Sequence, residues 1–255
     1  MIPDVLHIGP IPIHVFGIML AVAFFAAGSA LGREFARRGL EPELASSALV
    51  WAAVGGVVGA RLWTIVEEFD AFLADPVKLV VTGGGFTFYG GLLGGTLAMA
   101  AFFRRHGLSF LAGADATAPT VMLGQAIGRW GCQLSGDGDW GTETTLPWGM
   151  RYPYAVVGWD KPPGVYVHPT PIYESLAYFA IFFWLWAHRD RGWPDGSIFW
   201  WYLVLSGAAR FVIEFVRVNP TVVWGLSSAQ VTSVVLIVVG GAMLVGQRGW
   251  RTVAA

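Results

Sequence analysis

Apolar residues gather along the chain in seven long stretches, separated by segments rich in charge, glycine and proline. Each stretch is close to the roughly 17 to 25 residues that an α-helix needs to cross a bilayer. We therefore expect an all-α integral membrane protein, a single domain of residues 1–255 with seven transmembrane helices. The expected helices cover residues 13–31, 44–66, 86–103, 111–127, 171–187, 198–215 and 228–245.

Composition supports this fold class. The chain is 55% hydrophobic and 13% charged, whereas soluble domains carry roughly 25% charged residues. The net charge of −1 gives no reason to expect a nucleic-acid partner. A single cysteine excludes an intramolecular disulfide. Residues 1–12 lack the basic region and cleavage site of a secretory signal, so we expect the first helix to be retained.

Positive charges indicate which helix ends face the cytoplasm. Nine of the sixteen Lys and Arg residues lie in four connections on the same side of a seven-helix zigzag, namely 33–38, 104–105, 189–191 and 248–251. Cytoplasmic loops are enriched in these residues, so we expect the amino terminus outside (periplasmic) and the carboxyl terminus in the cytoplasm. The long connection 134–170, between the fourth and fifth helices, is then an external head segment.

The stretch 128–141 combines charge with glycine directly after the fourth apolar run. It contains Arg129 near its start, followed by Cys132, Asp137 and Asp139. This composition favours neither helix nor strand, so the fourth helix is expected to end near residue 127. An arginine at membrane depth costs roughly 2.5 kcal/mol or more on insertion scales, which indicates a functional role. Small thiols are mostly inert, so a nucleophilic Cys132 is the weaker alternative.

Two more arginines lie within apolar stretches, Arg61 and Arg210. Each of these arginines can be a headgroup anchor, or all of them converge on one anionic site. Arg210, Glu214 and Arg217 are spaced by four and three residues, so they share one helical face. They form either a structural ion-pair ladder or part of a site.

Such a ladder leaves one positive charge unmatched. It is balanced either by an external anion or by one of three carboxylates, Asp137, Asp139 and Glu174. Glu174 lies inside the fifth apolar stretch, which argues for a role beyond surface solvation. His168, just before that stretch, can simply cap the fifth helix.

Other polar residues and glycines have structural alternatives. His14 and Tyr89 can be interfacial residues rather than parts of a site. The five histidines are dispersed and no paired ligand spacing occurs, so we expect neither a metal nor a cofactor. Glycines spaced by three and four within residues 55–59 predict close helix packing. The run 83–85 resists a continuous helix and predicts a short interfacial or re-entrant segment within 67–81.

Taken in order, these patterns resemble the phosphatidylglycerol–prolipoprotein diacylglyceryl transferase family, from about residue 8 to 245. The family signature Gly-Arg-x-Gly-Asn-x-x-Asn-x-Glu-x-x-Gly is similar to residues 128–141. Gly128, Arg129 and Gly131 match, Cys132 and Ser135 replace the asparagines, and Asp137 or Asp139 replaces the glutamate.

Four further motifs carry the resemblance. Residues 89–94 are similar to the family's His-Gly-Gly-Leu-x-Gly, with Tyr89 in place of a histidine implicated in catalysis and Gly90 and Gly91 matching. In the first apolar stretch His14 matches the family, and Phe16-Gly17 replaces the family's Tyr-Gly. Residues 168–174 are similar to the family's His-Pro-x-Gln-x-Tyr-Glu, with Pro171 in place of the glutamine. Arg210, Glu214 and Arg217 match in full, and Ser206 replaces a tyrosine.

The resemblance implies an enzyme of the bacterial inner membrane that takes part in lipoprotein biosynthesis. It would move a diacylglyceryl group from phosphatidylglycerol to the cysteine thiol of a lipoprotein precursor, recognised by its signal peptide, and release glycerol 1-phosphate. Arg129, Arg210 and Tyr89 would be catalytic. The substrates would be held by Arg61, His14, Gly90, Gly91, Gly128, Gly131, Asp137, Asp139, His168, Glu174, Glu214 and Arg217.

Three alternatives stay open. The thiol proton can go to His14, His168 or a carboxylate, with Tyr89 only positioning the phosphate. The replaced motif residues also allow a paralogue that uses the same donor lipid with another acceptor. A non-catalytic lipid-binding or transport protein on the same scaffold is the third possibility.

Overall fold

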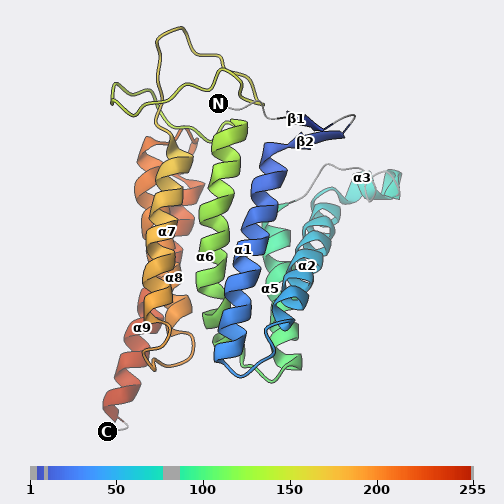
Figure 1. Cartoon of the computed structure of the whole chain (residues 1–255), viewed down its shortest axis with the longest axis vertical. Helices are drawn as coiled ribbons and strands as arrows, with labels where there is room; N and C mark the ends of the chain where they lie inside the picture. Colours follow the sequence, from blue (N-terminus) through green and yellow to red (C-terminus); the bar gives the residue numbers. More distant parts are fainter. Residues whose placement is uncertain (1–4, 9–10, 77–86, 254–255) are drawn as a thin grey trace. The chain divides into compact units, whose positions relative to one another are not determined.

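The computed structural model describes residues 5–8, 11–76 and 87–253 of the 255-residue chain (Figure 1). The described residues hold seven long helices: α1 (Val15–Arg37), α2 (Leu44–Glu67), α5 (Phe88–Arg105), α6 (Phe110–Ser135), α7 (Thr170–His188), α8 (Ser197–Ile213) and α9 (Ser228–Val253). They also hold the short helices α3 (Phe69–Ala74) and η1 (Glu214–Val216) and two antiparallel hairpins, β1–β2 (Val5–Ile8, Ile11–His14) and β3–β4 (Thr221–Val223, Leu226–Ser227).

Each expected helix therefore has a long helix at its place. Within the described residues, four segments are long and apolar enough to cross a membrane: Val15–Arg37, Leu44–Glu67, Ser197–Val216 and Ser228–Gln247. An all-helical architecture with several candidate spans is confirmed. The count of seven spans and their orientation stay predictions.

Several expected boundaries are wrong. The first helix starts at Val15 rather than at residue 13, because Ile11–His14 pairs as a strand with Val5–Ile8. The fourth helix does not end near residue 127 but continues through Ser135. It stops at Gly136, whose φ of 65° is the left-handed conformation common after a helix, and whose N–H donates to the Cys132 carbonyl at 3.0 Å.

One compact unit comprises residues 28–113 and centres on the contact between α2 and α5. A Cβ added to Gly59 would lie 2.3 Å from the Gly90 carbonyl oxygen and 2.7 Å from the Gly94 Cα. The predicted close packing of glycine-bearing helices is thus confirmed. A short helix, α3, follows α2 within residues 67–81, its interfacial or re-entrant position stays a prediction, and residues 83–85 lie outside the described residues.

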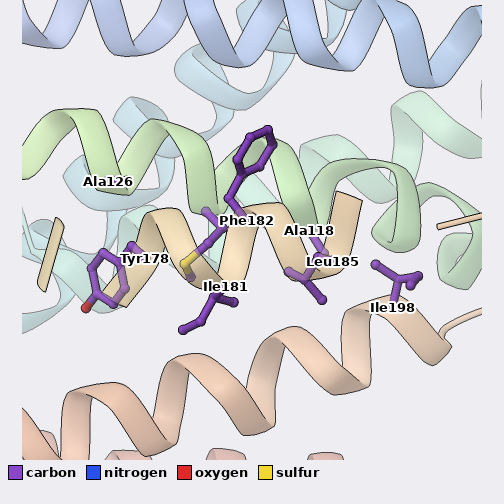
Figure 2. Packing of buried hydrophobic residues seen from close by; sticks show 8 residues of the cluster. Ala118, Ala126, Tyr178, Ile181, Phe182, Leu185 and Ile198 are labelled. Atoms are coloured by element: carbon purple, nitrogen blue, oxygen red, sulfur yellow. The ribbon is translucent and has the colours of Figure 1, made fainter. Parts of the chain in front are cut away.

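The other unit comprises residues 1–27 and 114–255. Its core lies where α6, α7 and α8 meet and consists of Ala118, Met122, Ala126, Tyr178, Ile181, Phe182, Leu185 and Ile198 (Figure 2). The buried Asp115 carboxylate of α6 accepts the backbone N–H groups of Gly196 and Phe199, each at 2.8 Å. It satisfies donors that the first turn of α8 leaves without helical partners, so α6 fixes where α8 begins.

Residues 136–169 connect α6 to α7 and lie at the ends of these helices (Figure 1). This head segment, predicted as 134–170, folds around Tyr152, which is almost fully buried and stacks on Trp140 with ring centroids 5.0 Å apart. The Tyr152 hydroxyl donates to Gln133 Oε1 of α6 at 2.9 Å. Burial raises the pKa of Tyr152 to about 12, so the phenol stays a neutral donor. The connection is therefore a packed segment anchored on α6.

Candidate active site

Six charged side chains meet at the ends of α6, α7 and α8 and form what we call the ion cluster. Arg129 comes from the last turns of α6, Glu174 from the first turns of α7, and Arg210 from the end of α8. Glu214 starts η1, Arg217 follows it, and Asp139 comes from the head segment. The cluster is therefore assembled from three helices and two connections distant in sequence.

Glu174 lies at the centre of the ion cluster. Its side chain is fully buried and contacts all three arginines: Arg129 Nε, Arg210 Nη1 at 2.9 Å and Arg217 Nη1 at 3.5 Å. A buried carboxylate needs such partners, since an unpaired charge in a low-dielectric interior is strongly unfavourable. Glu174 thus holds the three arginines in one place.

Glu214 confirms the ladder expected from residue spacing. Its Oε2 lies 2.7 Å from Arg210 Nη1 and 3.6 Å from Arg217 Nε. Its Oε1 accepts hydrogen bonds from Asn219 Nδ2 and Ser227 Oγ, each at 2.6 Å. Both oxygens are therefore used, and the ladder continues into the β3–β4 hairpin.

Asp139, rather than Asp137, joins the arginines. Its carboxylate pairs with Arg129 and with Arg217 Nη2, the latter at 2.5 Å, and its carbonyl oxygen accepts from Arg217 Nη1 at 3.2 Å. Burial raises the pKa of Asp139, but the charges of Arg217 and Arg129 outweigh it and leave the pKa below its usual value. Asp137 instead accepts the Asp139 N–H at 3.3 Å and is hydrogen-bonded to the Cys132 side chain.

The ion cluster is electrically balanced, with three arginines against three carboxylates. The one positive charge left over by Arg210, Glu214 and Arg217, together with the charge of Arg129, is offset by the carboxylates Asp139 and Glu174 rather than by an external anion. Arg129 and Arg210 keep 25% and 22% of their side-chain surface exposed, against 7% for Arg217. These two arginines can therefore still meet an anion from outside.

Glycines shape the approach of the backbone to the ion cluster. A Cβ on Gly141 would lie 2.2 Å from the Val216 carbonyl oxygen, so only glycine lets the head segment pass this close to η1. Hydrogen bonds fix the approach, from Gly141 N to His168 O and from Thr142 N to Val216 O, both 2.8 Å. Gly131 packs α6 against Phe16, at 3.1 Å from its would-be Cβ, whereas Gly128 has nothing within 4 Å.

A second polar chain lies where the head segment enters α7. Trp148 Nε1 donates to the Tyr173 hydroxyl at 2.8 Å, and that hydroxyl lies 3.1 Å from His168 Nδ1. Tyr173 therefore accepts from the indole and can donate its own proton to Nδ1, which would leave the His168 proton on Nε2. His14, also expected at the site, is exposed at the end of β2.

The remaining expected residues belong to the unit of residues 28–113. Arg61 is half-buried on α2, and Tyr89 is exposed at the start of α5. Gly90 and Gly91 face α2: their would-be Cβ atoms lie 2.5 Å from the Gly59 oxygen and 3.5 Å from the Gly56 oxygen. Packing therefore accounts for Gly90, and the expected binding roles of these residues stay predictions.

Asp139 of the ion cluster and its neighbours Cys132 and Asp137 have atoms that could hold a metal ion, with their ligand atoms within 4.8 Å of one another. It is the one such group found among the described residues. Asp139 is already paired with two arginines, and Arg129 Nη1 lies 3.7 Å from the Cys132 sulfur. These cations disfavour a bound cation at the same place.

Sequence reasoning missed the residues that support the ion cluster. Ser227 and Gln230 form a capping box at the start of α9: Gln230 N donates to Ser227 Oγ at 3.2 Å, and Ser227 N donates to Gln230 Oε1 at 3.0 Å. This Ser-x-x-Gln spacing is visible in the sequence. The bonds of Ser227 and Asn219 to Glu214 depend on the hairpin and leave no such signal.

Comparisons with known proteins identify the family of this chain. A family model described as "Prolipoprotein diacylglyceryl transferase" matches residues 3–246. Similar proteins include the phosphatidylglycerol–prolipoprotein diacylglyceryl transferases of Gloeobacter violaceus, 34% identical over 93% of this chain and 90% of that protein, and of Bacillus cereus, 30% identical over 95% and 91%. The chain belongs to the prolipoprotein diacylglyceryl transferase family.

Proposed function

We propose that this protein transfers a diacylglyceryl group from phosphatidylglycerol to the cysteine thiol of a prolipoprotein and releases glycerol 1-phosphate. Two observations support the proposal: relatives across nearly the whole chain are named for this reaction, and an arginine cluster suited to phosphate lies at the ends of three helices. Arginine binds phosphate through two parallel N–H donors.

The reaction moves negative charge toward the leaving phosphate. The thiolate sulfur attacks the glyceryl carbon that carries the phosphate, so a C–S bond forms as the C–O bond breaks. The bonding electrons stay on the phosphate oxygen, whose group changes from a monoanion to a dianion. The thiol proton passes to a base, with His14, His168 and a carboxylate as the candidates. Fixed positive charge at the leaving oxygen therefore lowers the barrier.

Arg129 and Arg210 are the residues we assign to that charge, since both are partly exposed and both are held by the buried Glu174. Arg217 and Glu214 keep the two in position. Such preorganisation means that the donors need no reorientation when the charge develops. The expected roles of Arg61, Tyr89, Gly90 and Gly91 in binding the donor lipid remain part of this proposal.

The ion cluster is already electrically balanced. A lipid phosphate that binds there must either displace one of the carboxylates or add a negative charge that no arginine compensates. Glu174 and Glu214 are 0% and 2% exposed and sit on helical elements, whereas Asp139 is 29% exposed and sits on the head segment. A phosphodiester carries the same single charge as Asp139 and uses the same N–H donors. The phosphate would therefore displace Asp139 from Arg129 and leave the net charge unchanged.

The family and the apolar helices support the cellular setting. All seven long helices would cross the bacterial inner membrane, with the amino terminus outside and the carboxyl terminus in the cytoplasm. The head segment would then lie outside, where its exposed Trp148, Tyr154 and Tyr166 can meet the signal peptide of the precursor. The bilayer itself supplies the donor lipid.

Replacing the arginines tests the assignment. Arg129→Ala and Arg210→Ala should each lower transfer from phosphatidylglycerol to a precursor peptide by about 10²- to 10³-fold, since each removes a donor to the developing charge. Arg191→Ala is the control, because Arg191 is exposed in the connection between α7 and α8. Full transfer by either site variant would overturn the assignment. Lipid cleavage without the peptide, seen by mass spectrometry, would indicate another acceptor.

Asp139→Asn tests the displacement. Removing the competing carboxylate should lower the KM for phosphatidylglycerol by about threefold to tenfold, since one anion no longer has to be displaced. Asp137→Asn is the matched control and should change the KM less, because Asp137 contacts the Asp139 N–H and Cys132 rather than an arginine. A raised KM for Asp139→Asn would mean instead that Asp139 only positions the arginines.

A further inference from the structure

The β3–β4 hairpin presents an apolar tip that no helix covers. Val222, Val223 and Trp224 are 59%, 46% and 95% exposed, and Val218 at its base is 68% exposed. Residues 218–227 contain no charged side chain. Contiguous exposed apolar side chains of this kind indicate a surface that contacts lipid or another molecule.

The position of the hairpin in the chain identifies lipid as its partner. The candidate spans Ser197–Val216 and Ser228–Gln247 end on either side of it, and only residues 217–227 separate them. A connection this short between two membrane-crossing helices must lie at the membrane surface. Tryptophan favours the boundary between headgroups and acyl chains, because its ring is apolar and its N–H is polar.

The turn at the tip does not explain its tryptophan. Val223 pairs with Leu226, so the loop consists of Trp224 and Gly225, whose φ angles are 49° and 76°. Two positive φ angles define a type I′ turn, in which asparagine followed by glycine is preferred. Trp224 is the one non-glycine residue with positive φ in the part of the chain that the structure describes. A side chain poorly suited to the turn is therefore exposed at its tip.

The base of the hairpin is hydrogen-bonded to the ion cluster. Asn219 and Ser227, one on each arm, both donate to Glu214 Oε1 at 2.6 Å. Arg217, which precedes the hairpin, contacts Asp139, Glu174 and Glu214. A contact that holds the tip of the hairpin in place therefore also holds Glu214, which pairs with Arg210 and Arg217.

We propose that residues 218–226 are a lipid anchor: Val222, Val223 and Trp224 insert at the headgroup–acyl boundary, and the inserted hairpin positions Glu214 and Arg217. Insertion is independent of the proposed transferase reaction, whereas its effect on catalysis rests on that function. Trp224 is thus a positioning residue, which acts on the reaction through the base of the hairpin.

Spin labelling tests the insertion. In a Cys132→Ser background, labels at Trp224→Cys and, separately, Val222→Cys are compared with one at Asp160→Cys, an exposed position of the head segment. The full chain is reconstituted in phosphatidylglycerol–phosphatidylethanolamine bilayers. Both tip labels should collide with oxygen more than with a water-soluble nickel chelate, and the label at position 160 should show the reverse.

Nickel accessibility at both tip positions equal to that at position 160 would overturn the anchor. A tip that is accessible to nickel until a precursor peptide is added, and protected afterwards, would also overturn it, because the partner would then be a protein.

The variant Trp224→Asn distinguishes a lipid-binding role of Trp224 from a role in stabilising the turn. Asparagine suits a type I′ turn better than tryptophan, so the melting temperature in detergent should stay equal or rise. The KM for phosphatidylglycerol in bilayers should rise about threefold to tenfold as the apolar contact is lost, with kcat changed less. Trp224→Phe, which keeps an aromatic ring, should keep the KM within about twofold.

An unchanged KM for Trp224→Asn would overturn the positioning role. A wild-type protein without transferase activity would refute the proposed function instead, and the spin-label result would still decide whether the tip inserts.

Discussion

The ion cluster and the contact between α2 and α5 hold helices together by opposite means. In the ion cluster, helix ends are joined by long side chains, with the buried Glu174 contacting three arginines. Along α2 and α5, the backbones touch because side chains are missing, and a Cβ on Gly59 or Gly94 would lie 2.3 Å from a carbonyl oxygen of the facing helix.

This difference predicts opposite sensitivities. Burial of charge makes the ion cluster intolerant of losing a side chain, since the remaining partners keep their desolvation cost without compensation. Backbone contact makes the α2–α5 interface intolerant of gaining one, since closely packed helices must separate to admit a methyl group. The first region carries the proposed chemistry, and the second supports the helix pair that bears Arg61 and Tyr89.

The largest effect is expected for Glu174→Ala. It leaves three arginines without their shared buried partner, so the free energy of unfolding should fall by about 3–5 kcal/mol. Thermal unfolding in detergent measures this loss. Glu143→Ala, which removes a carboxylate 61% exposed and 3.5 Å from Lys161, should cost less than about 1 kcal/mol. Equal losses for the two variants would show that burial of the ion cluster contributes nothing.

A smaller loss is expected for Gly59→Ala, about 1–3 kcal/mol, because the added methyl overpacks the α2–α5 contact. Gly56→Ala is the matched control on the same helix: its Cβ would lie 3.6 Å from the Gly91 oxygen, an ordinary van der Waals contact. The measurement is again thermal unfolding in detergent. If Gly56→Ala were as destabilising as Gly59→Ala, the loss of stability could not be attributed to the close backbone approach at Gly59.

The sequence predicted the elements better than their ends. Apolar length located the seven long helices, but α6 continues through Ser135 because hydrogen bonding and packing of Gly131 against Phe16 outweigh the low helix propensity of its last turns. The two hairpins were not predicted, since their strands are only two to four residues long. Strands this short carry too little periodicity to distinguish them from loops.

Prediction of the candidate site depended on sequence distance. Residue spacing correctly placed Arg210, Glu214 and Arg217 together, although α8 ends at Ile213 and Arg217 lies beyond η1 rather than on a shared helical face. Choosing between Asp137 and Asp139 required the path of the head segment, which is set by the contact of Gly141 with the Val216 backbone. Gly90 was expected to bind substrate, yet its packing against Gly59 becomes visible only when both helices are present.

The smallest expected effect is a dependence of stability on pH, which the ion cluster should show and the α2–α5 contact should not. The pKa of Asp139 is lower in the folded protein than the roughly 3.9 of an unfolded chain. Its ion pairs therefore stabilise the fold above about pH 4, and this contribution is lost as the pH falls from there through the folded-state pKa. The stability difference between wild type and Asp139→Asn, about 1 kcal/mol near neutrality, should shrink below about pH 4.

The penalty of Gly59→Ala should stay constant over the same range, because its cause is a backbone contact with no titrating group. Thermal unfolding of the three proteins between pH 7 and pH 3 makes the comparison. A difference for Asp139→Asn that did not change with pH would mean that the arginines do not stabilise its ionised form, and the lipid phosphate would then have no competing carboxylate to displace.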